Sequence, residues 1–229
     1  MTAPLKIISS MATRQVLADL ASAYEARASR KVALESVGGV DAATRVRAGE
    51  PFDAVVLASD AIDKLLASDH LVAGSKVDLA RSGVAVAVPA GAPRPEIGSE
   101  AALRRAVEAA FTIGYSTGPS GVALAKLFQR WGIAEQIRDR IVTPPPGVPV
   151  GSLVARGDIA LGFQQLSELI HVAGIDVLGP LPPELQIVTT FSAGVGARAR
   201  QPEDARALLA FMASPAATDA KRRQGMEAA

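Results

Sequence analysis

Two adjacent serines, Ser9 and Ser10, stand where an apolar segment ends and a helical pattern begins. The segment 5–8 (LKII) is typical of a buried strand, and apolar residues then recur at helical spacing from Val16 to Tyr24. A serine at the start of a helix can simply cap it. Alternatively, its hydroxyl and the N–H groups of the first helical turn can bind an anion. The pattern at this position leaves both interpretations open.

Other residues close to these serines favour an anionic ligand. Gly38 and Gly39 follow a second strand-like segment, 31–36, and glycines allow backbone N–H groups to approach a ligand closely. Arg14 lies in the first turn of the first helix, where a guanidinium can hold a planar carboxylate through two hydrogen bonds. The alternatives are a plain turn for the glycines and a solvated helix residue for Arg14.

A second group of small polar residues follows a later strand-like segment, 111–116. The stretch GYSTG (114–118) matches the G-x-S-x-G pattern of a hydrolase nucleophile, with Ser116 in the central position. That chemistry needs a helix that starts at once and a histidine partner. Here the helix is expected only from Ser120-Gly121, and His171 is the only later histidine. We therefore expect Ser116 to line a binding site or to cap the turn.

The composition excludes several other classes of function. The formal net charge of +1, with scattered Lys and Arg, argues against nucleic-acid binding. The absence of cysteine and the presence of only two histidines argue against a metal site, and we expect no cofactor. No apolar run approaches the length of about 18 to 20 residues needed for membrane insertion. The first residues, MTAPLKI, lack a secretory signal, which predicts a cytoplasmic protein, or a periplasmic one if a signal was removed.

The order of elements predicts an α/β protein with two lobes. Strand-like and helix-like segments alternate with short connections, which is typical of parallel sheets covered by helices. Extended segments near 82–90 and 180–195 interrupt this alternation. We expect one lobe from 1–83 together with 188–229, a second from 84–187, and a ligand in the cleft between them.

Four stretches resemble the type 2 periplasmic binding-protein fold and, within it, the molybdate-binding-protein family of solute-binding proteins. They are ISSMATRQVLADLASAYE, GGVDAATRVRAGEPFDAVVLASDAIDKL, TGPSGVALAKLFQRWGI and SLVARGDIALGFQQLSEL. The resemblance implies a small anion bound in the interlobe cleft and delivered to an ABC-transporter permease. By this resemblance, the family's ligand loops correspond to Ser9, Ser10, Gly38, Gly39, Ser120, Gly121, Val148 and Gln165. Arg14 and Ser116, singled out above from their own positions, complete the expected binding site.

The sequence departs from the molybdate pattern at three of these loops. The first serine of the family aligns with Ala12, the second is replaced by Gly39 or Val40, and the tyrosine is replaced by Gln165. The loss of hydroxyls favours a small carboxylate over a tetrahedral oxyanion. Relatives of this family that isomerise aconitate suggest an alternative function as a carboxylate isomerase. Glu35 and Asp41, which flank the second loop, are then the candidate bases.

Overall fold

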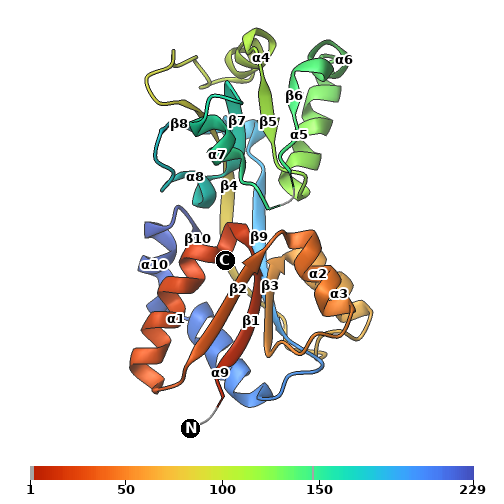
Figure 1. The fold of residues 1–229 in the computed structure, drawn as a ribbon, viewed down its shortest axis with the longest axis vertical. Helices are drawn as coiled ribbons and strands as arrows, with labels where there is room; N and C mark the ends of the chain where they lie inside the picture. The colour runs from red at the N-terminus through yellow and green to blue at the C-terminus, as the bar shows by residue number, and fades with distance from the viewer. Residues whose placement is uncertain (1–2, 146) are drawn as a thin grey trace. The chain divides into compact units, whose positions relative to one another are not determined.

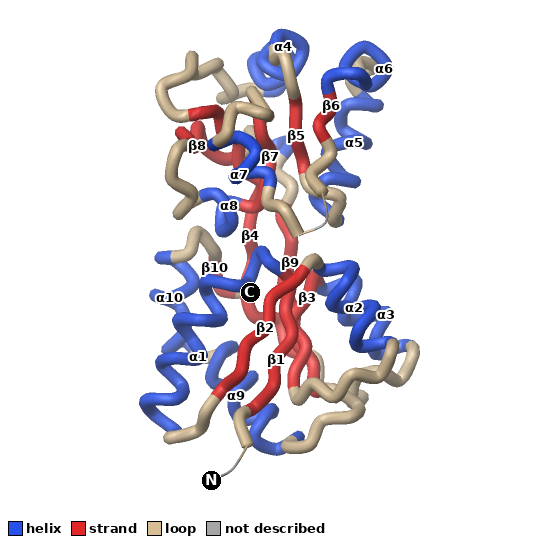
Figure 2. Tube along the Cα trace, in the orientation of Figure 1, coloured by secondary structure: helices blue, strands red, loops and turns tan. Residues whose placement is uncertain are grey.

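Short strands alternate with helices along most of the chain (Figures 1 and 2). The computed structural model describes residues 3–145 and 147–229. It divides into two compact units, Met1–Ser82 with Thr190–Ala229, and Gly83–Thr189. Strands β4 (Val77–Pro89) and β9 (Val188–Val195) each contribute residues to both units.

The first unit has a mixed sheet with the strand order β2-β1-β3-β9-β4, and β10 (Glu227–Ala228) pairs with β4. Strands β1 (Leu5–Ser10), β2 (Val32–Val37) and β3 (Ala54–Ala58) are parallel, whereas β9 is antiparallel to β3. The register places Ser9 opposite both Ser36 and Val56. The carboxyl ends of the three parallel strands therefore meet at one edge of the sheet.

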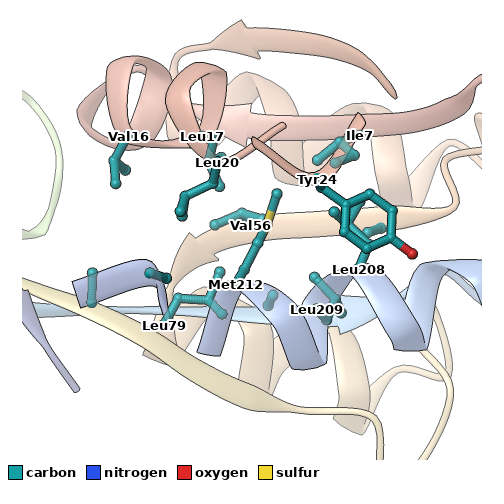
Figure 3. Packing of buried hydrophobic residues seen from close by; sticks show 14 of the residues in the cluster. Ile7, Val16, Leu17, Leu20, Tyr24, Val56, Leu79, Leu208, Leu209 and Met212 are labelled. Carbon is teal, nitrogen blue, oxygen red and sulfur yellow. The ribbon is translucent and has the colours of Figure 1, made fainter. Parts of the chain in front are cut away.

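Helices cover both faces of this sheet (Figure 1). One face packs against α1 (Arg14–Ala28), α9 (Pro202–Ala213) and α10 (Thr218–Arg223), and the other against α2 (Gly39–Arg47) and α3 (Ser59–Ala67). Figure 3 shows apolar side chains of α1 and α9 meeting those of β1 and β3 in the core. Alternation along β1 explains the two layers, because Leu5 and Ile7 join one core and Ile8 the other.

The second unit has parallel strands β5 (Ile113–Tyr115), β6 (Ile141–Val142) and β7 (Leu161–Gln165). Strand β4 is antiparallel to β7, and β8 (Ile175–Pro180) pairs with β4. The unit's helices are α4 (Glu100–Ala109), α5 (Pro119–Arg130), α6 (Ala134–Ile137), α7 (Val150–Ala155) and α8 (Leu166–Leu169). Helices α4, α5 and α6 pack on one face, and α7 and α8 on the other.

Several element boundaries differ from the sequence-based expectation. The pattern AATRVRAG predicts a helix over 42–49, but α2 begins earlier, at Gly39, with Gly38 as its N-cap residue. The pattern SELIHVAG predicts a helix over 167–174, but α8 ends at Leu169, and Gly174 adopts a positive φ of 82°. Strand β8 was not expected, since its segment IDVLGP contains Gly and Pro and lacks clear alternation.

No helix among the described residues is long and apolar enough to cross a membrane. Within the same residues, no group of three or more His, Cys, Asp or Glu side chains could hold a metal ion.

Candidate functional site

Three helix starts lie at the carboxyl edge of the parallel strands of the first unit. Strand β1 leads directly into a 3-10 turn, Met11–Thr13, which continues into α1. Strand β2 leads into α2 through Gly38, and β3 leads into α3 through Ala58. The free N–H groups in the first turns after β1, β2 and β3 therefore lie at the same edge of the sheet.

None of these three starts is capped by a side chain of its N-cap residue. Ser10, Gly38 and Ala58 occupy the N-cap positions and make no side-chain cap hydrogen bond. Ser99 in the second unit shows the contrast, because its Oγ accepts a hydrogen bond of 3.3 Å from the N–H of Ala102 and so caps α4. Uncapped first turns present N–H donors and a partial positive charge, which together favour an anion.

The hydroxyl of Ser10 provides an independent indication of a ligand. Only 8% of the Ser10 surface is exposed, and its buried Oγ has no hydrogen-bond partner in the described part of the chain. A Cβ atom added to Gly39 would lie 3.8 Å from Ser10 Cβ, so the start of α2 packs beside this hydroxyl. A buried polar atom without a partner costs about 1 to 3 kcal/mol. A ligand that bonds to Ser10 Oγ would remove this cost.

The side chain of Ser9 is hydrogen-bonded within the sheet. It is fully buried, its Oγ lies 2.8 Å from Oγ of Ser36 on β2, and it also donates to the carbonyl of Ser10 at 3.3 Å. The two serines point to opposite faces of β1, as alternation requires. Of this pair, Ser10 is therefore the residue suited to a ligand.

Gly38 and Gly39 do not need glycine for their backbone conformation. Gly38 has a φ of −56°, and neither residue is among those with positive φ. A Cβ atom on Gly38 would lie 3.2 Å from Oδ2 of Asp41. Because glycines have no side chain, a ligand beside Ser10 can approach the backbone N–H groups in the first turn of α2 closely.

Arg14 is exposed at the first position of α1, and its side chain makes no hydrogen bond or ion pair with the described residues. Arg14 follows Ser10 by four residues in the chain. It is therefore available to a ligand at this edge.

The two acids expected as bases differ in environment. Both carboxylate oxygens of Glu35 accept hydrogen bonds from Arg45, which also binds Glu50 and lies over the ring of Phe52. The hydrogen bond from Arg45 holds the pKa of Glu35 below its usual value, which makes this carboxylate a weaker base. Asp41 is exposed in the first turn of α2.

In the second unit, two predicted serines lie together at the start of α5. Oγ of Ser116 and Oγ of the buried Ser120 are 3.3 Å apart. A Cβ atom on Gly121 would lie only 1.5 Å from the carbonyl oxygen of Ser116, so this position accepts no side chain. The N-cap residue Gly118 makes no side-chain cap bond, which leaves the first turn of α5 open like those of the first unit.

Two glutamines at the end of β7 point to opposite faces, as expected from strand alternation. Gln165 is buried, its Nε2 donates to Oγ1 of Thr189 at 2.8 Å, and its buried Oε1 has no partner among the described residues. Both ends of the Gln164 amide are bonded: its Oε1 accepts from the N–H of Gly151 at 2.9 Å, and its Nε2 donates to Oε1 of Glu168 at 2.8 Å. Of the two glutamines, Gln165 is therefore the one with an unpartnered amide oxygen that could accept a hydrogen bond from a ligand.

Val148 lies in the turn before α7. Its N–H donates to the carbonyl of Pro145 at 3.0 Å, and its half-buried side chain packs against the cluster that includes Val150 and Leu153. Its backbone N–H is therefore already used within the turn.

Glu168 is a functional candidate that the sequence analysis missed. It lies on α8, directly after β7, and burial raises its pKa to about 7, although the hydrogen bond from Gln164 opposes this shift. A carboxyl group with such a pKa can exchange a proton near neutral pH. The spacing QQLSE, with Glu168 four residues after Gln164, was the available signal.

Comparisons with known proteins show which family the chain resembles and which fold it shares with solved structures. A family model described as bacterial extracellular solute-binding protein matches residues 5–227. An aconitate isomerase from Pseudomonas sp is 38% identical over 231 residues, covering 97% of this chain and 87% of that protein.

Solved structures show the same fold at low sequence identity. The Azotobacter vinelandii periplasmic molybdate-binding protein superposes with a TM-score of 0.81 at 20% identity, covering 97% of this chain and 98% of that one. L-phospholactate-bound PEB3 gives a TM-score of 0.76 at 14% identity, covering 97% and 99%. The predicted two-lobed periplasmic binding-protein fold is confirmed.

Proposed function

Because the chain belongs to the bacterial extracellular solute-binding proteins, which confirms the predicted family, we propose that its ligand is a small polycarboxylate of the aconitate type. The buried, unpartnered hydroxyl of Ser10 among three uncapped helix starts is the observation on which this proposal rests. It offers N–H and O–H donors to one carboxylate group. Charge-assisted hydrogen bonds of this kind are the stronger ones in proteins.

The same edge suits a carboxylate better than a tetrahedral oxyanion. A compact dianion such as molybdate needs several converging hydroxyls, but Ser9 is bonded to Ser36 and Gly39 has no hydroxyl. Arg14 is exposed and without a partner in the described chain, and a guanidinium matches the planar carboxylate group. The 38% identity to an aconitate isomerase supports the same ligand class.

A second function, isomerisation of the bound acid, is favoured by that relative. The identity of 38% over nearly the whole chain exceeds the 20% found with the molybdate-binding protein. An allylic proton shift, in which a proton leaves one carbon and enters another, converts cis- into trans-aconitate without a co-reactant. If the chain binds without converting, delivery to an ABC-transporter permease is the function that its family implies.

Isothermal titration calorimetry tests the ligand class. The titrants are cis-aconitate, trans-aconitate, citrate, molybdate and sulfate. We expect the tricarboxylates to bind more tightly than the oxyanions. Submicromolar binding of molybdate without any response to the carboxylates would overturn the proposal.

Proton NMR of cis-aconitate incubated with the protein tests the second function separately. Appearance of trans-aconitate in proportion to protein concentration supports an isomerase. Tight binding without conversion identifies a binding protein instead.

The cellular location is a further part of the proposal. The matching family is described as extracellular, which favours the periplasmic alternative over the cytoplasmic one. Fractionation of the source cells with an antibody against this chain would decide: signal in the periplasmic fraction supports transport, and signal confined to the cytosol contradicts it.

A further inference from the structure

We propose that Asp41 restrains ligand binding: its carboxylate occupies the start of α2 in the unliganded chain and competes there with the carboxylate of the ligand. The inference rests on the ligand site proposed above, at Ser10 and the uncapped start of α2. It concerns how strongly that site binds, and it does not depend on the isomerase activity.

The N–H groups that the ligand would use belong to the first turn of α2, and Asp41 is part of this turn. Asp41 is the third residue of the helix, after Gly39 and Val40. Bonding within the helix begins with the N–H of Ala42, which donates to the carbonyl of Gly38 at 2.9 Å. The N–H groups of the three residues before Ala42 are therefore the free donors of this helix start.

The side chain of Asp41 folds back over the start of its own helix. A Cβ atom added to Gly38 would lie 3.2 Å from Oδ2 of Asp41 and 3.8 Å from its Cγ. On the next residue, Gly39, an added Cβ atom would lie 3.8 Å from Cβ of Ser10. The Asp41 carboxylate and the unpartnered Ser10 hydroxyl thus lie beside adjacent residues of one turn, at the place proposed for the ligand.

The charge of Asp41 is not compensated within the described part of the chain. An aspartate and an arginine four residues apart on a helix can form an ion pair, and Arg45 has this spacing. Arg45 instead donates to both carboxylate oxygens of Glu35 and to both of Glu50. The carboxylate of Asp41 therefore makes no hydrogen bond or ion pair with the described residues.

Helix α3 shows the contrasting arrangement at the same edge of the sheet. Its first turn also contains an acid, Asp60, and Lys64 follows four residues later. The carboxylate and the ammonium group of this pair are 3.8 Å apart. A positive charge thus offsets the first-turn acid of α3, whereas the equivalent basic residue of α2 is bonded elsewhere.

The electrostatic effect of Asp41 has opposite signs in the empty and the filled site. In the empty site, a negative side chain at a helix start interacts favourably with the partial positive charge there. A ligand carboxylate bound to the same N–H groups would lie within one helical turn of Asp41, roughly 5 Å away. Two unit charges at this separation in water repel each other enough to raise Kd by about fourfold. Asp41 therefore stabilises the unliganded state and favours release of the ligand.

The test compares two substitutions of Asp41 by calorimetric titration with cis-aconitate at low ionic strength. Asp41→Asn removes the charge at nearly constant shape, and we expect it to lower Kd by at least about fourfold. Asp41→Glu keeps the charge, and its Kd should stay close to that of the wild type.

Asp69→Asn is the matched control, because it changes the net charge equally at a position away from the start of α2. Asp69 is exposed just after α3, and its positive φ of 56° suits asparagine. Its Kd should equal that of the wild type. The tighter binding of Asp41→Asn should disappear in about 1 M NaCl, where charges are screened beyond about 3 Å.

The outcomes separate this inference from the proposed site. If Ser10→Ala weakens binding but Asp41→Asn binds no more tightly than the wild type, the role of Asp41 is overturned and the ligand site stands. If neither the wild type nor Asp41→Asn binds cis-aconitate, the ligand site fails, and the role of Asp41 fails with it. Should Asp41→Asn not fold, Asp41→Ser removes the same charge and is held to the same expectation.

Discussion

The hydroxyl groups of Ser9 and Ser36 lie 2.8 Å apart across the paired strands β1 and β2, whereas the hydroxyl of the next residue, Ser10, is buried without a partner. Neighbouring serines in one strand thus have opposite roles. The hydroxyl of Ser9 links two strands of the sheet, whereas the hydroxyl of Ser10 makes no hydrogen bond within the described part of the folded chain. Substitutions of Ser9 and Ser10 should therefore have different effects on the stability of the protein and on its affinity for the ligand.

We predict that Ser10→Ala weakens polycarboxylate binding but does not destabilise the protein. Loss of one hydrogen bond to a charged ligand should cost about 1 to 3 kcal/mol of binding free energy, or about 5- to 150-fold in Kd. Removal of an unpartnered buried hydroxyl should leave the free energy of unfolding unchanged or slightly higher. Calorimetry and urea denaturation measure the two effects.

Ser9→Ala provides the matched control for this prediction. It leaves the Ser36 hydroxyl without its partner, so it should lower the free energy of unfolding by about 1 kcal/mol. Its Kd should stay within about twofold of wild type. If Ser10→Ala lowers stability and keeps full affinity, Ser10 is structural and the proposed site is incorrect.

Gly121→Ala should strongly destabilise the protein. The new methyl group would lie 1.5 Å from the Ser116 carbonyl oxygen, so the start of α5 must move away from the end of β5. Overpacking of this kind costs about 1 to 3 kcal/mol, and we expect the upper end because the opposing atom belongs to the backbone. The midpoint of urea denaturation gives the measurement. Gly118→Ala is the control, since its methyl group would meet only Ser116 Oγ at 3.8 Å, an ordinary contact.

The fold was predictable from the sequence because its signals are local and repeated. Apolar periodicity and glycine positions identify most strands and helices, and short strand-to-helix connections imply parallel strands. Segments with weak local signals were missed. Strand β8 (IDVLGP) depends on pairing with β4, a long-range partner that local pattern does not reveal.

The site was less predictable because its chemistry depends on hydrogen-bond partners. Sequence alone does not distinguish Ser9 from Ser10, since both are serines at a strand end; the partner Ser36 makes the difference. Glu35 was an attractive base until its ion pair with Arg45 became visible. Glu168 was overlooked because its environment comes from Gln164 and the first turn of α7, which no nearby motif indicates.

Gln165→Leu should weaken ligand binding while leaving stability nearly unchanged. The substitution removes an amide whose Oε1 is buried and unpartnered among the described residues, but it also removes the bond from Nε2 to Thr189. These effects oppose each other, so we expect a change in unfolding free energy within about 1 kcal/mol. Kd should rise by about fivefold or more if the amide bonds to the ligand. Thr189→Val controls for loss of the bond to Gln165 alone, and equal affinities of both variants and wild type would exclude Gln165 from the site.

Stability should depend on pH through Glu168. Its pKa is raised by burial to about 7 in the folded chain, against about 4.3 for an unfolded glutamate. The folded state therefore binds the Glu168 proton more tightly than the unfolded state does. The resulting contribution to the free energy of unfolding is fully present below about pH 4.3 and is lost as the pH rises through 7. Relative to wild type, Glu168→Gln should gain about 2 to 3 kcal/mol of unfolding free energy between pH 5 and pH 8, because glutamine does not ionise. Urea denaturation at unit pH steps provides the measurement, with Glu184→Gln as the control that should show a constant difference. A constant difference for Glu168→Gln as well would mean that its carboxyl group titrates normally and is not desolvated in the folded protein.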